Sequence, residues 1–308
     1  MKLFRGLDAR GVAPRGCVAT IGNFDGVHLG HQALLHRLAE QGAGLGLPVV
    51  AITFEPLPVE YFAPAGAPAR LTSLAEKAEA LQAAGVDRVW VLRFNRDLAQ
   101  LEPEAFVRRV LVDGASARHV LVGDDFRFGR DRAGDLDLLR ELGPGQGFEA
   151  AGMDSFRLDG QRVSSTRVRD ALAAGDMGTA EALLGRPYGM CGRVVRGDAL
   201  GRKLGYPTAN LLVARRPAVE GIFAVEVEGA GKGPLPGVAS LGTRPTVEGR
   251  RLLLETHLFD FDGELYGRRI RVIFRARLRG EQRFDSLDAL TEQMQRDEAE
   301  ARRILAGR

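Results

Sequence analysis

The pattern of apolar residues changes at Gly185-Arg186-Pro187, and this change limits the possible folds more than any other feature of the chain. Before it, short apolar runs alternate with stretches of helical spacing, which predicts parallel β-α-β units in a doubly wound sheet. After it, short strand-like segments follow one another as far as Leu287, which predicts an antiparallel β-barrel and then a terminal helix. We therefore expect two domains, residues 1–185 and 186–308, each with a core of its own.

The expected elements follow from the same patterns. In the first domain we expect strands at residues 17–20, 48–54, 86–94 and 119–122, and helices at 32–38, 72–84, 103–112 and 177–184. In the second domain we expect strands at residues 192–197, 221–227, 236–241, 252–259 and 270–278. The terminal helix should pack one apolar face against the barrel, formed by Leu287, Leu290, Met294, Ala301 and Ile304.

Composition excludes several classes of function. The formal net charge of the 308 residues is only +3, which argues against a dedicated nucleic-acid binder. Arginines alternate with apolar residues between Arg269 and Arg279, and a solvated strand face is the better interpretation of that row. No apolar run approaches the length of about 18 residues that a membrane span needs. The cysteines, Cys17 and Cys191, lie in separate domains, which favours free thiols in a reducing cytoplasm.

A turn rich in glycine and histidine follows the first expected buried strand and precedes a helix. Such a position offers unpaired N–H groups and the positive end of a helix dipole to a phosphate. His28 and His31 are three residues apart, so both imidazoles can face one phosphate and stabilise its developing charge. We consider a zinc site or ordinary helix-capping residues as alternatives, but no third metal ligand has suitable spacing. The other residues expected at this phosphate site are Gly22, Asn23, Phe24, Asp25 and Gly30.

The order G-N-F-D-G-x-H-x-G-H resembles the signature of adenylyl- and cytidylyltransferases, and two later segments extend the resemblance. Residues 123–130, G-D-D-F-R-F-G-R, resemble a segment of bacterial FAD synthetases, with Asp125 where Asn or Asp is expected. That carboxylate could contact the flavin, a ribose hydroxyl or a metal. Residues 162–169 are similar to the I-S-S-T-x-x-R motif of the superfamily and open a helix. From this segment the resemblance implies ATP phosphate ligands at Arg162, Ser165, Thr166 and Arg169, with Arg167 less certain.

In the second domain, G-R-K-L-G-Y-P-T-A-N at residues 201–210 could be a phosphate cradle or a turn before a strand. It resembles the hallmark of riboflavin kinases, as do the later segments L-E-T-H, Y-G-R and F-D-S-L. The resemblance implies metal ligands at Thr208 and Asn210 and a catalytic base at Glu255. The ATP-binding residues of this site would be Gly201, Lys203, Leu204 and Gly205.

Taken together, the chain resembles the bacterial bifunctional riboflavin kinase/FAD synthetases. The resemblance implies an N-terminal Rossmann-like nucleotidyltransferase domain and a C-terminal kinase barrel, with ATP, riboflavin, FMN and FAD as ligands and Mg²⁺ as cofactor. Riboflavin would be phosphorylated to FMN, and FMN then adenylylated to FAD with release of pyrophosphate. One alternative is a nucleotidyltransferase for another phosphorylated alcohol. The other is a flavin- or RNA-binding regulator with decayed sites, against which the intact His28, His31, Thr208, Asn210 and Glu255 argue.

Overall fold

The computed structural model describes residues 1–8, 11–197, 201, 205–246 and 249–307. The chain forms two compact units, one of Met1–Pro68 with Thr72–Ser164 and the other of Ala69–Leu71 with Ser165–Arg308. The helices that follow Ser164 therefore belong to the same unit as the barrel. Within the described ranges, no helix combines the length and the apolar character that crossing a membrane would require.

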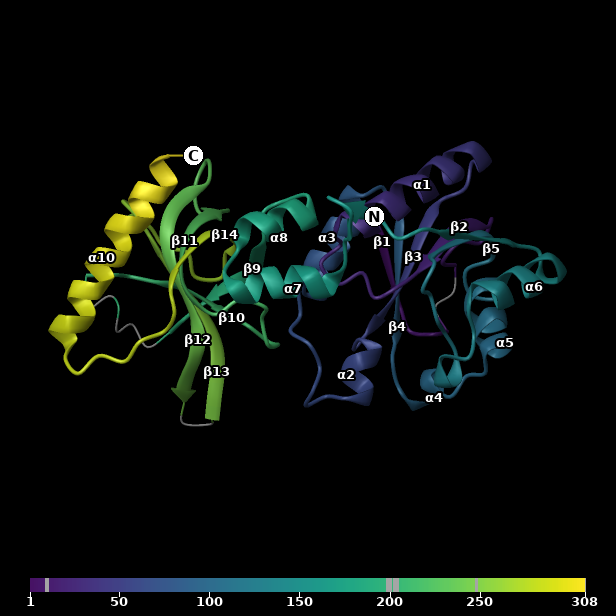
Figure 1. Ribbon diagram of the computed structural model, residues 1–308, viewed down its shortest axis with the longest axis horizontal. Helices are drawn as coiled ribbons and strands as arrows, with labels where there is room; N and C mark the ends of the chain where they lie inside the picture. Colours follow the sequence, from purple (N-terminus) through teal and green to yellow (C-terminus); the bar gives the residue numbers. More distant parts are fainter. Residues whose placement is uncertain (9–10, 198–200, 202–204, 247–248, 308) are drawn as a thin grey trace. The chain divides into compact units, whose positions relative to one another are not determined.

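A six-stranded parallel sheet is the centre of the first unit (Figure 1). In spatial order its strands are β1 (Lys2–Arg5), β4 (Arg88–Arg93), β3 (Val49–Glu55), β2 (Cys17–Ile21), β5 (Ala117–Gly123) and β6 (Glu149–Met153). The expected doubly wound sheet is thereby confirmed. From β2 the chain moves outward through β3 to β4, and it then returns to the other side of β2 for β5 and β6.

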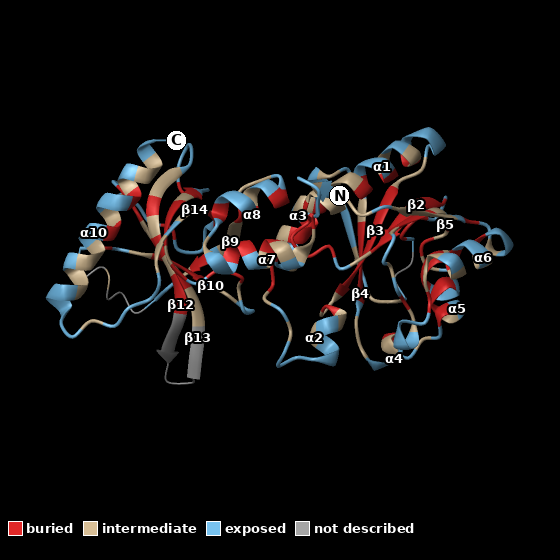
Figure 2. Cartoon of the chain, viewed as in Figure 1, coloured by how far each residue is buried: buried red, intermediate tan, exposed pale blue. Residues whose placement is uncertain are grey.

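Helices cover both faces of this sheet, and its central strands β4, β3, β2 and β5 are largely buried, whereas the edge strands β1 and β6 are not (Figure 2). One apolar cluster joins Leu35 and Leu38 of α1 and Leu81 of α3 to the sheet. The opposite cluster contains Phe106, Leu111 and Leu139. The helical elements are α1 (Leu29–Leu45), α2 (Pro58–Phe62), α3 (Leu74–Ala83), α4 (Arg96–Ala99), α5 (Pro103–Phe106), η1 (Val107–Val112), η2 (Arg130–Arg132) and α6 (Leu136–Gln146).

The strand order reverses between β2 and β5, and this fixes where a ligand can bind. In open α/β sheets the crevice outside the carboxyl ends of the strands opens at such a switch point. The histidine turn follows β2, and the segment that begins at Gly123 follows β5. Two segments chosen from the sequence for their chemistry therefore flank the one crevice that the topology favours.

The second unit is built on a closed antiparallel barrel, as expected (Figure 1). Around the barrel the order is β10 (Ala209–Leu212), β13 (Gly249–Leu258), β12 (Leu235–Thr246), β11 (Gly221–Glu228), β14 (Arg269–Arg279) and β9 (Gly189–Val195). Its interior includes Phe223, Leu254 and Phe274, which are 0–1% exposed. Helices α7 (Ser165–Ala174) and α8 (Met177–Leu184) precede the barrel, and α10 (Leu287–Ala306) contacts β11, β12 and β14.

Several details differ from the sequence-based expectations. The helix expected at residues 103–112 is a short α-helix that continues as the π-helix η1. Helix α6, strand β6 and the hairpin of β7 (Arg157–Leu158) and β8 (Gln161–Arg162) were not expected. The arginine row on β14 is not simply solvated, because acidic residues pair with it. The pairs are Arg271 with Glu228, Arg275 with Glu226 and Arg279 with Asp297, at 3.7, 2.7 and 2.7 Å.

Candidate active sites

The turn between β2 and α1 has an unusual backbone. Phe24 and Val27 have φ angles of 47° and 42°, and Gly26 between them has φ of 84°. A positive φ at a residue other than glycine costs on the order of 1–3 kcal/mol, so the surroundings must impose it. Phe24 and Val27 are 2% and 0% exposed, so core packing provides that constraint. Backbone strain of this kind concentrates at functional sites.

Hydrogen bonds from Thr72 hold the same turn. Its backbone N–H and its hydroxyl donate to Oδ1 of Asp25, at 3.1 and 3.2 Å. The N–H of Gly26 in turn donates to the Thr72 hydroxyl oxygen, at 3.1 Å. The Asp25 side chain is buried and braces the turn from within. Any contribution of Asp25 to phosphate binding would therefore come through the turn that it shapes, and that role stays a prediction.

His28 and His31 stack on each other at the start of α1. Their ring centroids are 3.7 Å apart and their planes differ by 15°. The N–H of His31 donates to Nδ1 of His28 at 3.3 Å, so His28 caps the helix. A nitrogen that accepts carries no proton, so neutral His28 has its proton on Nε2 and can donate from there. Burial, and then the nearby His28 and Lys77, keep the pKa of His31 well below its usual range. Imidazoles at a helix N-terminus, with His31 held neutral, are suited to donating to phosphate oxygens.

Gly22 leaves space for the Phe24 ring, and Gly30 leaves space for the His28 ring. A Cβ atom on Gly30 would lie 3.2 Å from both Cε1 and Nδ1 of His28. A Cβ atom on Gly22 would lie 3.1 Å from the Phe24 ring. The glycine of the H-x-G-H pattern thus allows the first imidazole to lie flat against the helix.

Asp125 and Arg162, chosen separately from the sequence, form an ion pair. Arg162 ends β8, and the Asp159-Gly160 turn of that hairpin has the two positive φ angles, 52° and 75°, that a tight hairpin requires. The hairpin base reaches the histidine turn, since Cβ of Phe156 would be 3.6 Å from a Cβ on Gly30. An exposed ion pair contributes little to stability, so Arg162 can turn toward an anionic ligand at small cost.

The remaining residues of the third motif lie in the second unit. Ser165 and Thr166 begin α7, as their predicted place at a helix start requires. Arg169 lies one turn later, and its Nε donates to the carbonyl oxygen of Ala69 at 2.6 Å. Phosphate binding by these three residues stays a prediction.

An aromatic cluster that was not expected from the sequence lies at the carboxyl ends of β3 and β4. The rings of Tyr61, Phe62 and Phe94 have centroids 5.2–5.6 Å apart, and Phe54 contacts Phe94 at 5.7 Å. Phe62 is 68% exposed, which is unusual for a residue of its size. Only the aromatic residues in the loop after β3 could have signalled this cluster, because the contribution of Phe94 depends on strand pairing.

In the barrel, strand pairing brings the predicted metal ligand and the predicted base together. Asn210 of β10 lies directly opposite Glu255 of β13, and Glu255 lies opposite Ser240 of β12. Directly opposed side chains project from the same face of a sheet, with Cβ atoms about 4.5–5.5 Å apart. The three residues form a polar row across three strands. Ser240 could not be predicted from the sequence, because its position next to Glu255 depends on the register in which β12 pairs with β13.

The alternation predicted around Glu255 is confirmed. Leu253, Glu255 and His257 line one cavity on the outside of the barrel, whereas Leu254 and Thr256 are 0% exposed. The cavity has a volume of about 680 Å³, within the range of small-molecule sites. The first half of α10 closes it with Leu287, Leu290, Met294 and Asp297. The apolar face of α10 is therefore divided, since Ala301 and Ile304 pack on the barrel while the earlier residues line the cavity.

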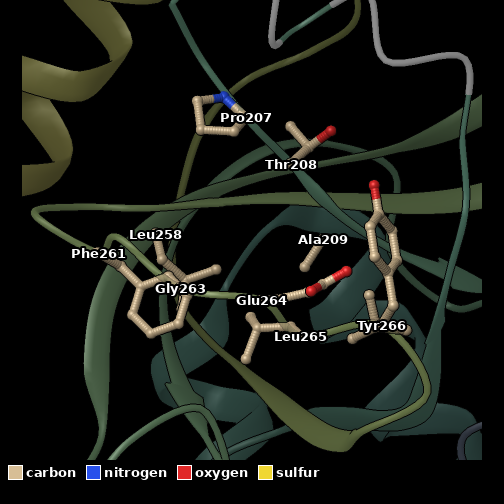
Figure 3. A pocket seen from close by; sticks show the side chains of 10 residues that line it. Pro207, Thr208, Ala209, Leu258, Phe261, Gly263, Glu264, Leu265 and Tyr266 are labelled. Atoms are coloured by element: carbon tan, nitrogen blue, oxygen red, sulfur yellow. The ribbon is translucent and has the colours of Figure 1, made fainter.

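A second cavity, of about 330 Å³, is lined by Pro207 and Thr208 and by residues of the segment from Leu258 to Tyr266. Figure 3 shows the polar side chains of Thr208, Glu264 and Tyr266 among its lining residues, together with the apolar Leu265 and Phe261. Thr208 lines both cavities. A ligand in each cavity would therefore approach the same threonine.

The surroundings of Asn210 fit its predicted role as a metal ligand, which stays a prediction. Asn210 is 4% exposed, and its Oδ1 atom has no hydrogen-bond partner among the described residues. A buried carbonyl oxygen without a partner is costly, and a hard cation would satisfy it. The described residues hold no cluster of three or more His, Cys, Asp or Glu side chains that could bind a metal. A divalent cation here would therefore need ligand phosphates to complete its coordination, as Mg²⁺ commonly does.

The loop before Thr208 is partly described. Gly201 and Tyr206 are joined by a backbone hydrogen bond of 2.7 Å, and a Cβ on Gly201 would lie 2.3 Å from the Tyr206 carbonyl oxygen. Gly205 has φ of 83°, which favours glycine. Lys203 and Leu204 lie outside the described residues. The structure thus requires both predicted glycines, while ATP binding by this loop stays a prediction.

Comparison with known proteins gives two family matches along the chain. A family described as FAD synthetase matches residues 12–167, and a family described as riboflavin kinase matches residues 184–305. Each match covers one of the two sites described above, apart from the last part of the third motif.

Relatives match over the whole length. The bifunctional riboflavin kinase/FMN adenylyltransferase of Pseudomonas fluorescens is 52% identical over 308 residues, covering 99% of this chain and 98% of that protein. The protein of the same description from Escherichia coli (strain K12) is 51% identical over 304 residues, covering 98% and 97%. A crystal structure described as a macrolide-efflux protein from Streptococcus pneumoniae has a TM-score of 0.81 and 29% identity, and covers 98% of this chain and 99% of that one.

Proposed function

Because this chain belongs to the family of bifunctional riboflavin kinase/FMN adenylyltransferases, we propose that it makes FMN from riboflavin and FAD from FMN at two separate sites. The kinase reaction is assigned to the barrel cavities, and the adenylyl transfer to the crevice at the histidine turn. The assignment of the kinase reaction to the barrel rests on one observation. The pairing of β10 with β13 sets Asn210 opposite Glu255, beside the threonine that two cavities share.

In the kinase reaction, riboflavin occupies the larger cavity and ATP the smaller one. The Glu255 carboxylate accepts the proton of the terminal ribityl hydroxyl, whose oxygen attacks the γ-phosphorus of ATP. The bond from the γ-phosphorus to the β,γ-bridging oxygen breaks, and ADP leaves. Thr208 and Asn210 would hold Mg²⁺, which neutralises charge on the phosphates when it is bound. The orphaned Oδ1 of Asn210 and the position of Thr208 between the cavities support these roles.

In the adenylyl transfer, a phosphate oxygen of FMN attacks the α-phosphorus of ATP in line, and pyrophosphate leaves. His28 donates from Nε2 to a phosphate oxygen on which charge develops, and neutral His31 supports it from the stacked position. Arg162 exchanges Asp125 for a phosphate, and Ser165, Thr166 and Arg169 are the further predicted phosphate ligands. The exposed rings of Phe62 and Tyr61 offer the flavin a surface to stack on.

The experiment that tests the kinase assignment compares the wild type with Glu255→Gln. With riboflavin, ATP and Mg²⁺ the wild type should yield FMN and FAD, separated by chromatography. The variant keeps the shape of the side chain but cannot accept the proton, so FMN formation should fall by roughly 10²–10⁴. FAD formation from supplied FMN should not change, which is the internal control for folding. Riboflavin phosphorylation at nearly the wild-type rate would remove Glu255 from its role as base, and a wild type that forms neither product would favour a flavin-binding regulator.

We also propose that the functional boundary lies at residues 185/186. A truncated chain of residues 186–308 should then phosphorylate riboflavin. The matched comparison is a chain of residues 165–308, which keeps α7 and α8 and so the whole second compact unit apart from Ala69–Leu71. If only the longer chain melts cooperatively and makes FMN, the two helices belong to the kinase and the boundary must move.

A cytoplasmic location is a further proposal. Burial raises the pKa of Cys17 to about 12, so this thiol is unreactive and suits a compartment in which thiols stay reduced.

A further inference from the structure

Lys77 of α3 has no exposed surface, although it lies in a helix that otherwise presents polar residues to solvent. Removing an ammonium from water is costly, and an apolar residue of similar size would be a cheaper way to fill the space. We therefore expect Lys77 to have a role that methionine or leucine could not perform. Such a role could not be predicted from the sequence, because lysine in a helix is normally exposed.

A chain of hydrogen bonds leads from Lys77 to the histidine turn. Nζ of Lys77 donates to the hydroxyl oxygen of Thr53, at 3.4 Å. The Thr53 hydroxyl donates to the backbone carbonyl of Asn23, at 3.3 Å. Thr53 is itself 0% exposed. The ammonium thus fixes which way the Thr53 hydroxyl points, and the hydroxyl fixes the carbonyl at the beginning of the strained turn.

The start of α3 holds the same turn from a second direction. Thr72, two residues before the helix, binds Asp25 and Gly26. The helix start is itself rigid, because Ser73 and Glu76 form a capping box. The segment of Thr72 to Lys77 therefore contacts the turn at Asn23 through Thr53 and at Asp25 and Gly26 directly.

From this geometry we propose that Lys77 is a positioning residue for adenylyl transfer, which acts through Thr53 and Asn23 to hold the turn that presents His28 and His31 to the phosphates. The buried ammonium also adds positive charge behind a site that binds a triphosphate, where no water screens it. Burial, then His28 and then Lys77 lower the pKa of His31, so the Lys77 charge acts in the same direction as burial on that imidazole. The inference rests on the proposed adenylyl transfer at this turn.

The test uses single substitutions in the full chain. Lys77→Met keeps the bulk of the side chain but removes the charge and the donor, and Thr53→Val removes the relay. Because a displacement of about 1 Å near reacting groups can cost roughly 10²-fold, Lys77→Met should lower kcat for FMN-to-FAD conversion by about 10²-fold, with KM for FMN changed less. Thr53→Val should lower kcat by about tenfold, and the double variant should be no slower than Lys77→Met alone, since both act on one relay.

Two controls separate positioning from packing. Thr53→Ser keeps the hydroxyl and should restore most of the activity that Thr53→Val loses. Thr20→Val removes a buried hydroxyl of the adjacent strand that has no hydrogen-bond partner among the described residues, and it should leave FAD formation unchanged. Riboflavin phosphorylation by each variant reports on the second site, and thermal melting reports on folding.

Normal FAD formation by Lys77→Met, or equal losses in Thr53→Val, Thr53→Ser and Thr20→Val, would overturn the inference. If Lys77→Met does not fold, the contrast between Thr53→Val and Thr53→Ser decides alone. A wild type that makes no FAD from FMN would instead refute the proposed function.

Discussion

The close contact between Gly30 and His28 leads to a prediction in which activity falls while stability does not. A Cβ atom at position 30 would lie 3.2 Å from two atoms of the His28 ring, whereas carbon atoms at van der Waals contact are about 3.5–4.0 Å apart. In Gly30→Ala the ring must therefore move by roughly 0.3–0.8 Å. Since a 1 Å displacement can cost about 10²-fold, FMN-to-FAD conversion should fall by about tenfold.

The same substitution should not destabilise the chain. Gly30 lies in α1 and has no positive φ, so alanine gains up to about 0.5–1 kcal/mol of helix propensity, which offsets the cost of moving one ring. Gly44 of the same helix is the matched control, because a Cβ there meets no atom within 4 Å. Gly44→Ala should keep full activity and melt slightly higher.

The assay measures FAD from supplied FMN, FMN from riboflavin and the melting temperature for both variants. If Gly30→Ala forms FAD as fast as Gly44→Ala, the orientation of the His28 ring does not matter for the reaction. If Gly30→Ala also loses riboflavin phosphorylation, the substitution has disturbed more than the turn. Either result would refute the reasoning.

Three more predictions concern single side chains. His28→Ala should lower FMN-to-FAD conversion by about 10²–10³, as expected for one lost donor to a developing oxyanion. Riboflavin phosphorylation, assayed in parallel, should stay near the wild-type rate. Equal loss of both activities would show that His28 has only a structural role. Asn210→Leu should raise the Mg²⁺ concentration needed for half-maximal FMN formation at least tenfold, measured by titration, because the cation loses a ligand; an unchanged titration would remove Asn210 from the metal site. The lowered pKa of His31 means that the unfolded chain binds more protons than the folded one below about pH 6.5. The free energy of unfolding should therefore fall as the pH drops from 6.5, by at most about 1.4 kcal/mol per pH unit, and His31→Gln should reduce that slope in denaturant melts between pH 5 and 7.5.

Local patterns predicted much of this molecule. The alternation of residues 252–258 placed Glu255 on one face with Leu253 and His257, and the strand-turn-helix order placed the histidine turn at the end of a buried strand. Both inferences depend only on neighbours in the sequence, whose geometry is fixed by the period of a strand or helix.

Features that depend on distant pairing could not be predicted. Ser240 lies beside Glu255 only because β12 pairs with β13 in one register. Lys77 resembles any exposed helical lysine until the sheet that buries it is known. The ion pairs of the β14 arginines have the same origin, since their partners come from β11 and α10. In each case the missing information was the arrangement of segments far apart along the chain.

The polar row of Asn210, Glu255 and Ser240 has a consequence for the kinds of sequence change that the kinase half can tolerate. Its spacing is set by backbone hydrogen bonds, so a substitution at one position leaves the other two in place. Inserting or deleting one residue within β13 would instead exchange the two faces of the strand. Glu255 would then point into the barrel, where Leu254 or Thr256 lies now, and Leu254 would face the cavity. In a library that covers residues 252–258, substitutions should give graded losses, whereas single-residue insertions and deletions should abolish folding almost uniformly.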